Sequence, residues 1–149
     1  MAYITQQDLL DELGLAKLVQ LTDSTSSNMV DAARVAKAIS SAEGTFESYA
    51  RTRYELPVPA TEKVKSICVD LAVFNLKRSR TTTEEGIKNL RVALYDPAIR
   101  FLEALSSGKA ALDIPAASET ATSPASPDKV KRGSNKRKAV FSDEKLGSY

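Results

Sequence analysis

The sequence of 149 residues predicts an all-α fold, a small bundle of four to five helices with an extended C-terminal arm. Apolar residues recur every three or four positions in four segments before residue 106, which is the spacing of one face of a helix. Alternation of apolar and polar residues never extends beyond a few positions, so the sequence lacks the pattern of a strand. From residue 114 the composition changes to Ala, Ser, Thr and Pro and then to cations, which indicates an arm rather than a packed helix.

The chain is expected to open with two short helices. Thr5 and Asp8 have the spacing of a capping box, and Gly14 ends the helix that follows them. A second short helix is expected over residues 15–21. The polar stretch after it has the composition of a loop, and Asn28 is predicted to cap the next helix.

A long amphipathic helix is expected over residues 29–53. Its apolar positions step by three or four and are Ala32, Val35, Ile39, Ala42, Phe46 and Tyr49. Many side chains on this helix are small, so a second helix can approach it closely. A short loop stiffened by Pro57 and Pro59 follows, and two long helices joined in this way are expected to pack antiparallel.

The segment from residue 61 to residue 79 is expected to be the central helix. Its apolar residues are Val64, Ile67, Cys68, Val69, Leu71, Ala72, Val73, Phe74 and Leu76. They cover more than one face of the helix, so the helix needs packing partners on several sides. Thr61 is the predicted N-cap, and Glu62 places a carboxylate in the first turn. Cations lie at its end, where the helix dipole favours them: Lys77, Arg78 and Arg80.

A last helix is expected to begin after residues 81–83 and to end at Gly108. The three threonines of residues 81–83 form overlapping capping boxes with Glu84 and Glu85. Pro97 interrupts this helix. The apolar phase continues through Pro97, which predicts one kinked helix or two abutting helices rather than a loop. The core residues predicted from all these stripes are Ile39, Phe46, Ile67, Leu71, Leu90, Leu94 and Phe101.

Three regions follow from these patterns. They are a helical domain over residues 1–112, an Ala/Ser/Pro-rich and then basic linker over residues 113–138, and an anchor segment over residues 139–149. The linker ends in a basic arm of six cations without an anion, Lys129, Lys131, Arg132, Lys136, Arg137 and Lys138. Apolar and aromatic groups return in the anchor segment, where Phe141, Leu146 and Tyr149 are the predicted contact residues for a partner. The helical domain is neutral, so the whole excess of two positive charges lies in residues 113–149.

The composition argues against an enzyme. The chain has no histidine and one cysteine, Cys68, which removes the usual nucleophile–base pairs and the His- or Cys-ligated metal sites. No glycine-rich phosphate loop is present. Adjacent carboxylates such as Asp11 and Glu12 point to different faces of a helix, so they are interpreted as solvated surface. We therefore expect no catalytic residues, no metal and no cofactor, and the lack of a long apolar run predicts no membrane span.

A DNA-binding regulator is the alternative hypothesis. In that hypothesis the two short helices form a helix-turn-helix and the basic arm contacts phosphates. The second short helix offers only Lys17 and Gln20 on its outer face, whereas a recognition helix is usually polar and basic there. The basic arm itself is compatible with a solvated linker, with DNA contact, or with contact to an acidic protein surface.

The order and spacing of several short motifs resemble one known family. These motifs are Met1-Ala2-Tyr3-Ile4-Thr5 with Asp8-Leu9, Gln20-Leu21-Thr22-Asp23, Tyr49-x-x-x-Arg53-Tyr54-x-Leu56-Pro57, Ala98-Ile99-Arg100-Phe101-Leu102-x-x-Leu105-x-x-Gly108-Lys109, and the final Phe141-Ser142-x-x-x-Leu146-x-x-Tyr149. Together they resemble the head-tail connector, or adaptor, proteins of tailed bacteriophages, the Mu-like version in particular. The resemblance covers residues 1–112 well and residues 139–149 loosely.

This resemblance implies a structural protein of the virion, assembled in the host cytoplasm. Members of the family form a homo-oligomeric ring, usually of twelve copies, beneath the portal after DNA packaging. The implied partners are the portal protein and a tail-side stopper or tail-completion protein, with the anchor segment in contact with the portal or a neighbouring subunit. Such a ring encloses DNA without sequence-specific binding, and a neutral helical domain fits this role because duplex affinity grows with the number of phosphates neutralised.

Overall fold

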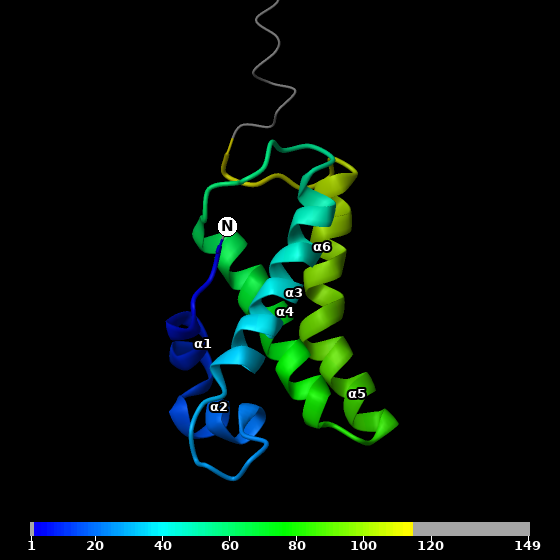
Figure 1. Cartoon of the computed structure of the whole chain (residues 1–149). Helices are drawn as coiled ribbons and strands as arrows, with labels where there is room; N and C mark the ends of the chain where they lie inside the picture. The colour runs from blue at the N-terminus through cyan, green and yellow to red at the C-terminus, as the bar shows by residue number, and fades with distance from the viewer. Residues whose placement is uncertain (1, 115–149) are drawn as a thin grey trace, which may run out of the picture.

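Five helices make up residues 2–114, the part of the chain that the computed structural model describes, and these residues contain no strand. The helices are α1 (Gln6–Leu13), α2 (Leu15–Thr22), α3 (Ala32–Ala50), α4 (Glu62–Arg80) and a last helix in three parts, α5 (Glu84–Leu90), η1 (Arg91–Tyr95) and α6 (Asp96–Ser106) (Figure 1). The predicted all-α bundle of four to five helices is confirmed.

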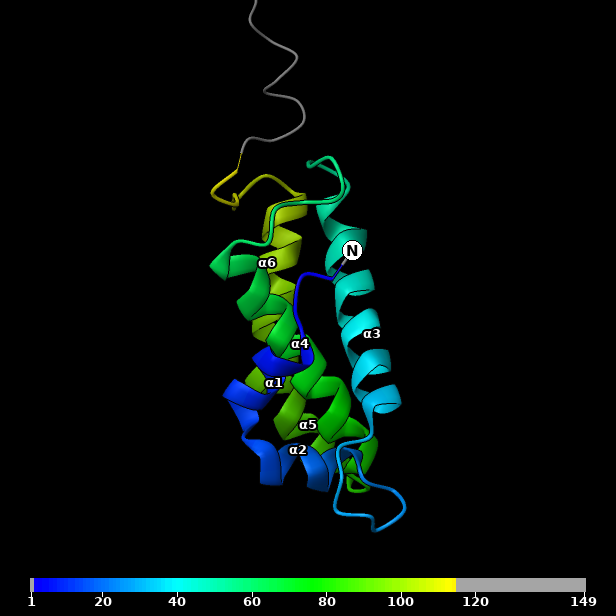
Figure 2. The ribbon, with the colours of Figure 1, turned by 60° about the vertical axis from the view of Figure 1, so that its left-hand side comes forward.

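The helix α4 lies at the centre of the bundle and contacts every other element. α3 and the composite α5–α6 helix both run antiparallel to α4, and α3 and α6 also contact each other, while α1 and α2 pack on another side of α4 (Figures 1 and 2). Thr61 caps its start, because the Thr61 hydroxyl accepts a hydrogen bond from the Val64 amide at 3.4 Å. The buried residues of α4 are Val64, Ile67, Cys68, Leu71, Ala72, Val73, Phe74 and Leu76. A helix with so many buried positions needs partners on several sides, and the bundle provides them.

The helix α3 begins later than the sequence predicts. Asp31, not Asn28, is its N-cap, and the Asp31 carboxylate accepts from the amides of Ala33 and Arg34 at 3.0 and 3.2 Å. Asn28 lies in the preceding loop at φ +54, where its amide donates to the Asp23 carboxylate at 2.8 Å. Asn tolerates this left-handed conformation better than most residues, which suits it to a turn rather than to a cap, whose backbone is extended.

Pro97 neither breaks nor sharply splits the last helix. The backbone stays helical through η1, a π-helical segment in which the Asp96 amide donates to the Arg91 carbonyl, five residues back. The wider turn lies immediately before Pro97, which stands in the first turn of α6, where a missing amide is tolerated. α6 ends where the sequence predicts, because Gly108 adopts φ +81 and Lys109 donates back to the Ala104 carbonyl at 2.8 Å.

The predicted core residues fall into two groups. Phe46, Ile67 and Leu71 are buried. Ile39, Leu94 and Phe101 are only partly buried and pack against the margin of the core. Leu90 does not belong to the core: α5 has no buried residue, because it covers only the end of α4, and Leu90 lines a surface groove instead.

Candidate functional site

The residues predicted to make functional contacts lie outside the described part of the chain. These are Phe141, Leu146 and Tyr149 of the anchor segment and Lys129, Lys131, Arg132, Lys136, Arg137 and Lys138 of the basic arm. They stay predictions, as do the boundaries of the linker and of the anchor segment. The surface of residues 2–114 includes three grooves that are each lined by residues from different helices.

An acidic groove of about 470 Å³ lies between α1 and the first half of α4. Its lining residues are Asp8, Asp11, Glu12, Glu62, Lys65, Ser66, Val69 and Asp70. Five of these are carboxylates and one is a cation. Neither of the two ion pairs found within residues 2–114 neutralises any of these carboxylates. The groove therefore presents a concentrated negative charge to solvent.

Two carboxylates of the acidic groove have shifted pKa values, in opposite directions. Partial burial, and then the negative charge of Glu12, raise the pKa of Asp70, and Lys63 offsets only part of this. Hydrogen bonds from the Thr5 amide and hydroxyl, at 2.6 and 2.8 Å, hold the pKa of Asp8 below its usual value. Burial and the charge of Glu12 therefore disfavour the ionised form of Asp70, whereas hydrogen bonds at the start of α1 stabilise the ionised form of Asp8.

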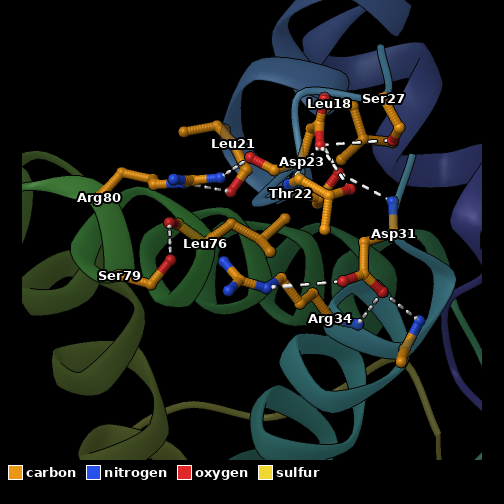
Figure 3. A network of polar contacts seen from close by, with 12 residues as sticks. Leu18, Leu21, Thr22, Asp23, Ser27, Asp31, Arg34, Leu76, Ser79 and Arg80 are labelled. Atoms are coloured by element: carbon orange, nitrogen blue, oxygen red, sulfur yellow. Dashed lines mark hydrogen bonds and ion pairs between the residues drawn. The ribbon is translucent and has the colours of Figure 1, made fainter. Parts of the chain in front are cut away.

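A basic groove of about 580 Å³ lies between the first half of α3 and the second half of α4. Its lining residues are Arg34, Lys37, Ala38, Ser41, Asn75, Leu76, Arg78 and Ser79, with no carboxylate among them. Arg34 is paired with Asp31 at 3.6 Å, at the start of α3 (Figure 3). No ion pair within residues 2–114 holds Lys37 or Arg78.

The acidic groove and this basic groove lie on opposite sides of α4. Nine residues of α-helix correspond to about two and a half turns, so residues nine apart point in opposite directions. Three lining residues of the acidic groove are each nine residues before a lining residue of the basic groove: Ser66 and Asn75, Val69 and Arg78, Asp70 and Ser79. One helix therefore separates two surfaces of opposite charge.

A third groove, of about 620 Å³, lies between α2, the end of α4 and α5, and its cations are Lys17, Lys77 and Arg80. Arg80 has a structural role here: its guanidinium donates to the Leu21 carbonyl at 3.0 Å and to the Asp23 carbonyl, at the C-terminal end of α2 (Figure 3). Thr22 completes this junction, because its buried hydroxyl donates to the Leu18 carbonyl at 2.8 Å and accepts from the Asp31 amide at 3.2 Å.

The opposite end of the bundle is closed by two tyrosines. The ring of Tyr3 packs edge-on against Phe46 at 5.3 Å, and its hydroxyl donates to the Glu47 carboxylate at 3.1 Å. Burial raises the pKa of Tyr3. The hydroxyl of Tyr54 accepts from the amide of Leu112 at 2.9 Å, which fixes the last described segment against the loop between α3 and α4. The chain therefore leaves the described part at the end of the bundle where α4 begins (Figures 1 and 2).

Residues 2–114 contain no group of three His, Cys, Asp or Glu side chains able to hold a metal ion. Cys68 is buried, and burial raises its pKa to about 12, which leaves the thiol unreactive at neutral pH. No helix of the described part has the length and apolar character needed to cross a membrane.

The two short helices do not have helix-turn-helix geometry. That motif joins its helices by a turn of about three to four residues, whereas Gly14 alone separates α1 from α2. Lys17 is the one cation of α2, and α1 presents Asp8, Asp11 and Glu12 beside it. Carboxylates at this position repel phosphates, which argues against α1 and α2 as a DNA-reading unit.

Two comparisons place the chain among known proteins. A family model described as Bacteriophage Mu, Gp36 matches residues 3–130. The Mu-like prophage FluMu protein gp36 of Haemophilus influenzae is 29% identical over 122 residues, which cover 81% of this chain and 82% of that relative.

Proposed function

The chain belongs to the bacteriophage Mu Gp36 family, and from this premise we propose that it is a structural virion protein that forms a ring adaptor between the portal and the tail. In this proposal the ring assembles on the portal after DNA packaging and gives the tail or its stopper protein a docking surface. The subunit has no catalytic step to perform. Its partners are the portal protein, a tail-side protein and further copies of the same chain.

Family membership is the observation that carries the proposal. The match begins at residue 3, runs through the rest of the helical domain and continues to residue 130, so it includes the Ala/Ser/Pro-rich part of the linker and the first cation of the basic arm, Lys129. A family pattern that extends so far suits a protein in which the helical domain and the arm act together. The anchor segment lies beyond the match, and its role rests on the chemistry of Phe141, Leu146 and Tyr149.

The physical properties of the chain are compatible with a ring around DNA. Residues 1–112 carry as many acidic as basic side chains. A neutral subunit neutralises few phosphates, so DNA can pass through the ring without being held. Aromatic side chains at the end of a long arm offer a large contact area at a low entropic cost, which suits attachment to a neighbouring ring.

Deletion of residues 139–149 tests the proposal. We expect the truncated protein to keep the melting temperature of the parent, because the deleted segment lies far in sequence from the helical core. We also expect it to be missing from portal-containing heads, because an anchor tethered to a docked domain contributes through a high effective concentration. A variant with Ser142 replaced by Ala is the matched control and should join heads as the parent does. If the truncated protein joins heads equally well, the contact surface lies on the helices.

A further inference from the structure

The acidic groove between α1 and α4 has more carboxylates than cations, and neither ion pair found within residues 2–114 neutralises one of these carboxylates. Its five carboxylates come from two helices and face one lysine, Lys65. Asp70 is half-buried beside Glu12, so their mutual repulsion is only partly screened by water. A cationic segment in this groove would relieve that repulsion.

The same chain supplies such a segment. Residues 129–138 contain six cations and no anion, and they lie outside the described part. Four uncharged residues separate the cations: Val130, Gly133, Ser134 and Asn135. Val130 is apolar, which suits a groove that has Val69 in its lining. The other two grooves are basic and would repel it.

The position where the chain leaves the described part also favours contact between the basic segment and the acidic groove. The Leu112 amide is bonded to Tyr54, so the chain leaves the described part beside the loop that leads into α4 (Figure 1). Along α4 the groove extends from Glu62, in the first turn of the helix, to Asp70, which lies eight residues or roughly 12 Å further along the helix. A coil of the length between residues 114 and 129 spans about 20 Å, so the basic segment reaches the groove of its own chain.

From the charge of the groove, the charge of the arm and the position where the arm begins, we propose that the acidic groove between α1 and α4 binds residues 129–138 of the same chain. The tether makes this contact an intramolecular one at high effective concentration, which favours it over contact with another copy in dilute solution. The contact holds the anchor segment beside the first half of α4. This inference concerns the free chain and does not depend on the proposed adaptor role.

Paramagnetic relaxation in the full-length chain tests the inference. Ser134 is replaced by Cys and carries a nitroxide, and the buried Cys68, with its pKa of about 12, is left unlabelled. We expect the amide signals of Asp11, Ser66 and Asp70 to lose most of their intensity, and those of Lys37 and Arg78 on the opposite side of α4 to keep most of theirs. At about 1 M salt, where the screening length falls to ~3 Å, the loss at the groove should disappear.

Two variants that each remove three carboxylates provide the control. Asp11→Asn, Glu12→Gln and Asp70→Asn together remove three charges from the groove and should abolish the selective loss. Glu55→Gln, Glu85→Gln and Glu103→Gln remove three exposed carboxylates outside it and should leave the loss unchanged.

Three results would overturn the inference. The first is equal loss of intensity on both sides of α4, and the second is a loss at the groove that survives neutralisation of the groove. The third comes from a mixture of isotope-labelled chain without nitroxide and unlabelled chain with it. Selective loss in this mixture assigns the groove to a neighbouring copy, and its absence supports the contact within one chain. Should the groove variant fail to fold, the salt dependence of the parent alone decides the outcome.

Discussion

Replacement of Leu71 by Ala is expected to destabilise the helical domain strongly. Leu71 lies in the middle of α4 and is only 2% exposed. The change removes three carbon atoms from the core, at about 0.8 kcal/mol each, and leaves a cavity that the surrounding helices cannot fully close, so the total loss is roughly 2–5 kcal/mol. For a domain of ~100 residues this lowers the melting temperature by roughly 10 °C or more, measured by circular dichroism. Leu71→Asp buries an unpaired carboxylate and should prevent folding altogether.

The matched control for this change is Val92→Ala, which also shortens an apolar side chain. Val92 lies in η1 and is 60% exposed, so its replacement should change the free energy of unfolding by less than ~0.5 kcal/mol. Equal melting temperatures for Leu71→Ala and Val92→Ala would refute the central position of α4 in the core.

Three further predictions follow from the structure. Asp31→Ala should lower the free energy of unfolding by ~1 kcal/mol in urea titrations, whereas Asp31→Asn should change it little, since either Asp or Asn can cap α3. An equal loss of unfolding free energy in the two variants would contradict the role of Asp31 as the N-cap. The raised pKa of Asp70 means that the folded chain binds the carboxyl proton more tightly than the unfolded chain does. The stability that this proton contributes is therefore fully present below the ordinary pKa of 3.8 and is lost as the pH rises through the raised pKa. Asp70→Asn should therefore raise the melting temperature relative to the parent at pH 7 but not at pH 3, and a gain of the same size at both would contradict the shift. If the basic arm contacts DNA, duplex affinity should fall steeply with salt and vanish when its six cations become Gln, whereas salt-independent binding would argue against phosphate contacts.

Most of the helical architecture could be predicted because its signals are local. Thr5, Thr61 and Gly108 mark helix ends by their own chemistry and by that of residues within one turn. The start of α3 was predicted wrongly because Asn28 and Asp31 are both competent caps in sequence. In the structure the Asp23 carboxylate accepts a hydrogen bond from the Asn28 amide and holds Asn28 in the loop, while the Thr22 hydroxyl accepts one from the Asp31 amide at the start of α3. Both contacts come from the preceding helix end, which sequence periodicity does not describe.

The grooves could not be predicted because they join residues distant in sequence. The sequence predicts Asp11 and Glu12 as solvated surface, and no residue near them in sequence indicates that Asp70 lines the same groove. The one available signal was Asp70 itself, a carboxylate in the middle of an otherwise apolar stretch of the central helix. The sequence predicts Leu90 in the core for the converse reason, because its spacing matches the apolar stripe of the last helix. In the structure α5 has no buried residue and Leu90 does not belong to the core, so spacing alone does not show whether another helix covers the stripe.

Electron microscopy of the purified full-length chain, with and without the purified portal protein, tests the adaptor role most directly. The account predicts closed rings of this chain seated on one face of the portal ring, and loss of these complexes when residues 139–149 are deleted. Portal rings that look the same in the presence and absence of the chain would contradict it.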